Sequence, residues 1–143
     1  MREERRWLVI IWKIFRAILV GLALAGLIFG AFFWFRIKSD GHFALRNAKN
    51  VRFAIETVGI EYYGDGRSIY SADSPDGMRR GAKEKVQRLA GEQGDFILEG
   101  YDAPGNMVLQ MKYTEGNYVV IFGMDESGNE SWSLKYLLDL DLL

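Results

Sequence analysis

The sequence predicts an α+β fold in which one apolar helix precedes a single small domain of helices and antiparallel strands. Three observations predict it. Residues 17–35 form an uncharged apolar run, residues 44–62 carry an apolar stripe of helical period, and apolar residues alternate with period two from Asp95 onward. Residues 36–143 are numerous enough for one ordinary domain, so we expect no second one.

The apolar run at residues 17–35 is expected to cross a membrane once. As an α-helix its nineteen residues extend about 28 Å, close to the ~30 Å hydrocarbon core of a bilayer. Trp7 and Trp12 precede it and aromatic residues 32–35 end it, as is typical of membrane interfaces. The run exceeds a usual signal-peptide core and no cleavage site follows, which favours an uncleaved anchor over a signal peptide or a buried helix.

Basic residues flank this run equally, so the predicted orientation depends on the N-terminal tail, residues 1–16. Five basic residues lie on each side: Arg2, Arg5, Arg6, Lys13 and Arg16 before it, and Arg36, Lys38, Arg46, Lys49 and Arg52 after it. A short tail that begins with basic residues is typical of an anchor whose N-terminus stays in the cytoplasm. We therefore expect a single-pass plasma-membrane protein whose domain, residues 36–143, is extracytoplasmic.

Small residues lie on one face of the predicted membrane helix. Gly26 and Gly30 form a G-x-x-x-G pair, and Ala23 extends the same face. Such a face lets a second helix approach closely, so the spacing favours a partner protein or self-association within the bilayer. Ordinary membrane-helix composition is the alternative interpretation.

Two helices are expected after the membrane helix. The first covers about residues 43–63, on the stripe of Ala44, Ala48, Val51, Ile55, Val58 and Tyr62. Residues 39–41 either cap it or bend a continuing helix, and Gly64 is expected to end it in a left-handed conformation. The second covers about residues 75–91, with Ser74 as N-cap and a stripe of Met78, Ala82, Val86 and Leu89.

Four strands are expected to follow, at about residues 95–101, 106–113, 117–123 and 130–136. Their inward-facing sets are Phe96 and Leu98, then Met107, Leu109 and Met111, then Tyr118, Val120 and Phe122, then Trp132, Leu134 and Tyr136. The segments between them contain the Gly, Pro, Asn and Asp that turns require, which predicts an antiparallel meander. Residues 137–143 either continue the alternation or become helical.

The residue types present exclude several kinds of chemistry. The chain has no cysteine, and its single histidine, His42, lies close to the predicted membrane helix, so thiolate and histidine-dependent catalysis are not expected. Asp125 begins a calcium-loop spacing, but Glu130 and Tyr136 stand where Gly and Glu are needed. The basic residues of 79–88 spread around a helix and do not form a nucleic-acid patch. We expect no enzyme, no catalytic residues, no metal, no cofactor and no identifiable small-molecule ligand.

The order of elements resembles the layout of type IV pilins and pseudopilins. A short tail, one membrane helix, the amphipathic segment ALRNAKNVRFAIETVGIEYYG, a connecting loop and a four-stranded meander carry the likeness. The resemblance implies that the amphipathic helix packs on the sheet. The prepilin cleavage motif, a basic leader ending in Gly before a mature chain with Glu at its fifth position, is absent, so no family functional residue is carried over.

Two hypotheses of function follow from this sequence. The first is a non-enzymatic, membrane-anchored interaction or structural protein, such as a pilin-like or accessory subunit of a bacterial envelope assembly. The second is an anchored ligand-binding or sensor module, whose binding surface would contain four tyrosines near the end of the long helix: Tyr62, Tyr63, Tyr70 and Tyr101.

Overall fold

The computed structural model describes residues 2–91, 94–136 and 140–141. The chain divides into two compact units, Met1–Ser39 and Asp40–Leu143, and the helix α1 (Arg2–Gly64) begins in the first and ends in the second. Serine, aspartate and glycine at 39–41 lie inside α1, so the interpretation of these residues as a cap for a new helix was wrong. Their helix propensities cost about 1 kcal/mol or less each, which the good helix formers on both sides offset.

The first unit is helical throughout its described residues, and its large apolar side chains from Trp7 to Phe35 are exposed. α1 contains an 18-residue window with a mean hydropathy of 2.4, of which no part is buried. It is therefore long enough and apolar enough to cross a membrane. A Cβ atom added at Gly26 or Gly30 would meet no atom within 4 Å, so the predicted packing face with Ala23 remains open and stays a prediction.

The predicted apolar stripe is the side of α1 that packs on the sheet of the second unit. All of its members are buried, from fully covered Ala48 and Ile55 to Tyr62 at 8% exposure. α1 ends through hydrogen bonds from Gly66 N–H to Tyr63 C=O at 2.9 Å and from Arg67 N–H to Tyr62 C=O at 2.9 Å. This is a Schellman cap with Gly66 (φ 71°), and not Gly64, at its left-handed position.

The second helix, α2 (Ala82–Ala90), is shorter than the predicted 75–91. Residues 74–81 form turns, because Gly77 and Gly81 have φ values of 72° and 83° that an α-helix does not allow. The carboxylate of Asp76 accepts hydrogen bonds from the Ser74 hydroxyl at 2.7 Å and the Met78 N–H at 3.0 Å, which stabilises these turns. Gly91 ends the helix as predicted.

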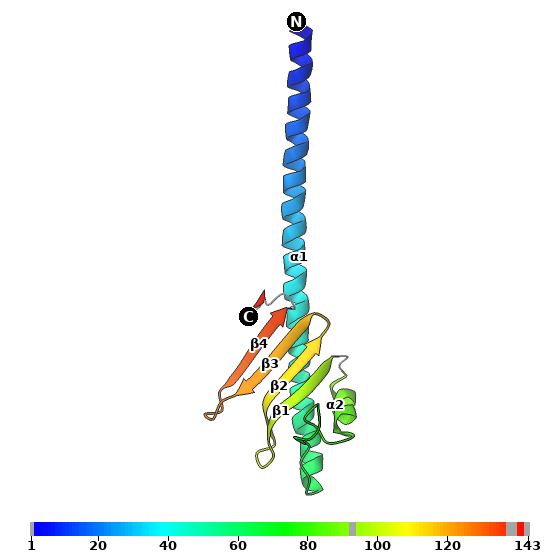
Figure 1. Ribbon diagram of the computed structural model, residues 1–143, viewed down its shortest axis with the longest axis vertical. Helices are drawn as coiled ribbons and strands as arrows, with labels where there is room; N and C mark the ends of the chain where they lie inside the picture. Colours follow the sequence, from blue (N-terminus) through cyan, green and yellow to red (C-terminus); the bar gives the residue numbers. More distant parts are fainter. Residues whose placement is uncertain (1, 92–93, 137–139, 142–143) are drawn as a thin grey trace. The chain divides into compact units, whose positions relative to one another are not determined.

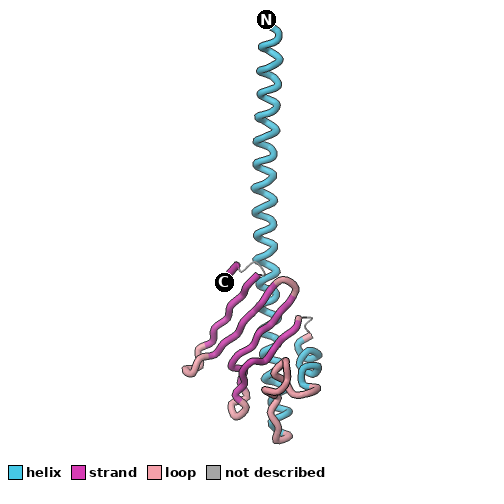
Figure 2. Tube along the Cα trace, viewed as in Figure 1, coloured by secondary structure: helices cyan, strands magenta, loops and turns pink. Residues whose placement is uncertain are grey.

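An antiparallel sheet covers one side of the later part of α1, and α2 lies beside its first strand (Figures 1 and 2). The strands of the sheet pair in chain order: β1 (Asp95–Asp102), β2 (Met107–Glu115), β3 (Tyr118–Met124), β4 (Glu130–Tyr136) and the two-residue β5 (Leu140–Asp141). The predicted meander of four strands is confirmed and β5 extends it. Predictions for 137–139 and 142–143 lie outside the described residues.

A bulge in β1 changes which residues of β2 face the helix. The register shifts between Leu98 and Gly100 and again between Gly100 and Tyr101. As a result Val108 is fully buried, whereas Met107 is 40% exposed and Leu109 is half-buried, so the prediction that both of these face inward was wrong. Leu89 of α2 was also predicted to be buried and is 54% exposed. Of the other positions predicted to face inward, Tyr118, Trp132 and Tyr136 are only half-buried. The rest fill the core together with Tyr113: Phe96, Leu98, Met111, Val120, Phe122 and Leu134.

Candidate functional site

An open groove of about 520 Å³ lies between the end of α1, the loop that follows it and the turn that joins β1 to β2. Tyr63 and Tyr101 contribute aromatic rings, Ile69 and Pro104 contribute aliphatic surface, and Arg67 contributes a cation. A concave, mostly apolar surface with a single charged group is the usual composition of a ligand site.

The α1 side of this groove is held by the Schellman cap described above. Besides its backbone bond, Arg67 places its guanidinium carbon 5.4 Å from the centre of the Tyr62 ring and donates from Nη2 to Asp65 Oδ2 at 2.9 Å. Tyr63, the next residue, is 64% exposed, and its ring forms part of the groove. Neighbouring helix residues differ by 100°, which is why one tyrosine is buried and the other is not.

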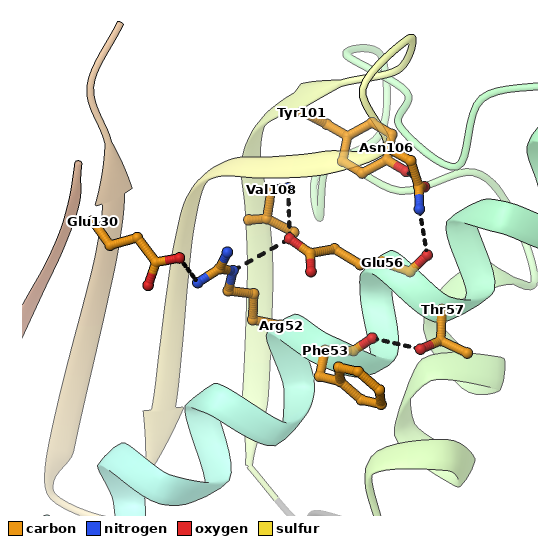
Figure 3. A network of polar contacts seen from close by, with 8 residues as sticks. All are labelled: Arg52, Phe53, Glu56, Thr57, Tyr101, Asn106, Val108 and Glu130. Atoms are coloured by element: carbon orange, nitrogen blue, oxygen red, sulfur yellow. Dashed lines mark hydrogen bonds and ion pairs between the residues drawn. The ribbon is translucent and has the colours of Figure 1, made fainter. Parts of the chain in front are cut away.

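The opposite side of the groove is formed by Tyr101, which the β1 bulge directs towards α1 (Figure 3). Its hydroxyl donates a hydrogen bond to Asn106 Oδ1, and Asn106 Nδ2 donates to the Glu56 C=O at 2.8 Å. Burial, followed by the nearby carboxylates of Glu56 and Asp102, raises the pKa of Tyr101 to about 12. A tyrosine phenol is protonated at neutral pH in any case, and the raised pKa keeps this one a donor to higher pH.

The structure brings together two of the four predicted aromatics. Tyr63 and Tyr101 line the groove, whereas Tyr62 is buried beneath Arg67 and Tyr70 is oriented by its hydroxyl, which lies 3.5 Å from the Glu99 C=O. Sequence reasoning missed Arg67 and Pro104. The sequence feature that could have indicated these residues is their position in two Gly-containing turns, 64–68 and 103–106. These turns interrupt the regular spacing of apolar residues in the helix and in the strands.

A polar network next to the groove joins α1 to the strands β2 and β4 (Figure 3). Glu56 Oε1 accepts from Arg52 Nε at 3.3 Å and from the Val108 N–H at 3.2 Å, and Arg52 Nη1 lies 2.7 Å from Glu130 Oε1. The hydrogen bond from Arg52 lowers the pKa of Glu130. The network fixes α1 on the sheet and therefore fixes the groove wall that α1 provides.

The side of α1 away from the sheet carries exposed apolar residues. Phe53 is 70% exposed and Ile60 is 64% exposed, and Thr57 lies between them at helical spacing. The Thr57 hydroxyl donates to the Phe53 C=O at 2.8 Å, so this polar group is already hydrogen-bonded (Figure 3). We call Phe53, Thr57 and Ile60 the open face of α1. Sequence reasoning overlooked it, although both apolar residues lie outside the predicted stripe.

Within residues 2–91, 94–136 and 140–141, no cluster of His, Asp and Glu side chains could hold a metal ion. His42 is exposed on α1. No protein-family profile, curated protein or solved structure matches this chain. The groove, the open face of α1 and the apolar helix of the first unit are therefore the features that bear on function.

Proposed function

We propose that the protein is a non-enzymatic, single-pass membrane-anchored interaction subunit, of a pilin-like or accessory kind, in a bacterial envelope assembly. The observation that carries the proposal is the open face of α1, where Phe53 and Ile60 are 70% and 64% exposed. Large apolar side chains clustered on one side of an element are typical of interaction surfaces. The occupant that we propose for this face is the same face of a second copy.

The chemistry of the open face supports burial by another helix. Covering a Phe or Ile side chain contributes about 1.5–3 kcal/mol at full burial. Thr57 adds little desolvation cost, because its hydroxyl already donates to the Phe53 carbonyl within α1. The spacings of four and three from Phe53 to Thr57 to Ile60 match the seam of a left-handed helix pair.

The apolar helix supports self-association in parallel orientation. Two copies anchored by the same helix enter a membrane in the same direction, so their α1 helices run the same way. Ala23, Gly26 and Gly30 offer a further contact between copies within the bilayer, separate from the open face. The order of an apolar helix, a helix packed on a sheet and a meander also supports a pilin-like subunit.

Cysteine crosslinking in membranes tests this proposal, because the chain contains no cysteine of its own. Single variants Phe53→Cys and Ile60→Cys are each expressed in bacterial membranes with two different epitope tags and then oxidised. Since a disulfide needs Cα atoms within about 7 Å, a dimer carrying both tags is expected from these two positions.

The matched control is Ile121→Cys, which is 39% exposed on the outer face of the sheet and should remain monomeric. Equal crosslinking at all three positions would mean random collision. Monomer alone at Phe53 and Ile60 would contradict self-association through the open face.

The groove supports a second candidate, an anchored binding module. Tyr63, Tyr101 and Arg67 give it two aromatic surfaces and one cation. A ligand that binds the folded state raises the melting temperature. A thermal-shift screen of the full chain in detergent tests this candidate, and no stabilising compound among peptides, sugars and nucleotides would count against it.

A further inference from the structure

We propose that the groove between the end of α1 and the β1–β2 turn binds an extended, proline-containing peptide segment that carries a carboxylate. This inference supplies the ligand class for the second candidate function and depends on that candidate. It is independent of the proposed self-association, because Tyr63, Arg67 and Tyr101 lie outside the open face of α1.

The shape of the groove favours a segment of chain over a compact small molecule. Sites for small molecules typically enclose 70–90% of the ligand surface. The groove here has about 520 Å³ but is open to solvent between α1 and the turn at 103–106. An extended peptide can lie in such a groove and continue beyond it at both ends.

The lining favours proline within that segment. The rings of Tyr63 and Tyr101, with Pro104 beside them, form an aromatic-lined surface. Proline-rich segments dock on aromatic-lined grooves because their extended conformation is already formed and costs little entropy on binding. The Tyr63 hydroxyl can donate to a carbonyl group that a proline-containing chain leaves unpaired, whereas the Tyr101 hydroxyl already donates to Asn106.

The charge on the α1 side of the groove favours an acidic residue in the segment, because Arg67 lies there, whereas the carboxylates of Glu56 and Asp102 lie near Tyr101 on the opposite side. Among its described lining residues, Arg67 is the charged one. Its guanidinium donates to Asp65 across an exposed ion pair, at side-chain exposures of 54% and 64%, which contributes little stability. A guanidinium has five N–H donors, so several remain for a carboxylate of the ligand in a two-point contact.

The walls of the groove are held in place without a ligand. The Schellman cap fixes Arg67, and the Tyr62 ring supports its guanidinium. Tyr101 is held by Asn106, in the space that Gly59 leaves open. A site with walls already in position loses less entropy when it binds, so even a short peptide is expected to bind measurably.

Fluorescence anisotropy with the full chain in detergent micelles tests the proposal. The probe is a labelled peptide of Glu-Pro-Pro repeats, compared with matched Lys-Pro-Pro and Glu-Ala-Ala peptides. We expect the first to bind about tenfold more tightly than either of the others, a difference that loss of one good contact produces.

Variants of the exposed groove residues locate the binding. Tyr63→Ala and Arg67→Gln should each weaken binding of the Glu-Pro-Pro peptide about tenfold. Arg67→Lys should have an intermediate effect, because lysine keeps the positive charge but cannot make the two-point contact of a guanidinium with a carboxylate. Phe53→Ala is the matched control, an exposed α1 aromatic outside the groove, and should bind as the wild type does. Circular dichroism checks that each variant is folded.

The proposal would be overturned by no binding of the Glu-Pro-Pro peptide at millimolar concentration, by equal binding of the lysine peptide, or by binding unaffected by Tyr63→Ala. Tighter binding of a neutral sugar such as chitotriose would overturn it too. If another compound raises the melting temperature while the peptide fails, the peptide class is wrong and the second candidate function stands.

Discussion

Gly59 leaves the space that the Tyr101 hydroxyl and the Asn106 amide occupy beside α1. A Cβ atom at this position would collide with both side chains. Because Asn106 in turn donates to the Glu56 carbonyl at 2.8 Å, a displacement at Gly59 would reach the contact between α1 and the β1–β2 turn. The absence of a side chain at Gly59 therefore determines the geometry of the groove wall.

We expect Gly59→Ala to destabilise the second unit by about 1–3 kcal/mol, since overpacking forces Tyr101 and Asn106 to move. Urea unfolding of the full chain in micelles measures the change. Gly64→Ala is the control: Gly64 is also helical, but a Cβ there meets nothing within 4 Å, so helix propensity should make it neutral or slightly stabilising. Equal effects of the two substitutions would refute the packing argument.

Lys83 connects α2 to two carboxylates. Its Nζ lies 2.6 Å from Asp95 Oδ1 and 4.0 Å from Asp76 Oδ2. The hydrogen bond from Lys83 lowers the pKa of Asp95 below 3.8. At Asp76 burial acts in the opposite direction, but hydrogen bonds from the Ser74 hydroxyl and the Met78 N–H outweigh it, and that pKa is lowered as well.

A carboxylate with a lowered pKa stabilises the fold above its unfolded-state pKa, and this contribution is lost as the pH falls through the folded-state value. We therefore expect the urea midpoint to fall between about pH 4 and pH 2. Lys83→Met should make this fall shallower. Lys85→Met should retain the wild-type slope, because Lys85 pairs with Glu61 at 3.2 Å and with neither aspartate. The same slope in both variants would contradict this assignment.

The elements with a clear period could be predicted from the sequence. The stripe from Ala44 to Tyr62 marks a helix face that must be covered, and the alternation after Asp95 marks strands with one buried face. Where the chain departs from a regular period, sequence reasoning failed. The bulge at Gly100 depends on pairing with a distant strand, and no local pattern in Met107 or Leu109 reveals it.

The start of α2 and the composition of the groove could not be predicted from local sequence either, because both depend on tertiary contacts. Ser74 and Pro75 are good helix-start residues, but the loop containing them pairs with β1 through Leu98 N–H and the Asp76 C=O at 2.9 Å. Tyr63 and Tyr101 could be proposed as surface aromatics, because both lie near expected turns. Arg67 completes the groove because of the geometry of the helix cap. The prediction from the sequence put that cap two residues too early.

The contact between this loop and the edge of β1 explains a requirement for glycine at Gly77. Gly66 and Gly77 have nearly equal φ values, 71° and 72°, but only at Gly77 would a Cβ atom collide with the Leu98 carbonyl. We expect Gly66→Ala to cost about 1 kcal/mol from the left-handed conformation alone. Gly77→Ala should cost clearly more and should speed amide hydrogen exchange at Leu98. Equal costs in urea unfolding would show that the clash is relieved.

The proposed anchor predicts on which side of a membrane the second unit lies. Asn129-Glu130-Ser131 is a glycosylation sequon on the exposed β3–β4 turn. With the N-terminus in the cytoplasm, translation into microsomes should glycosylate Asn129, seen as a mobility shift that Asn129→Gln abolishes. An unmodified chain that added protease digests would contradict this orientation, and a chain extracted by alkaline carbonate would contradict the anchor.

Charge substitutions make this orientation test decisive, because five basic residues lie on each side of the apolar run. Positive charges near the ends of a membrane helix favour the cytoplasmic side. Replacing Arg36 and Lys38 by Gln should therefore increase the glycosylated fraction. Replacing Arg5 and Arg6 by Gln should decrease it. If neither pair changes the fraction, basic residues do not set the orientation of this chain, and the preference must come from the length and the aromatic ends of the helix itself.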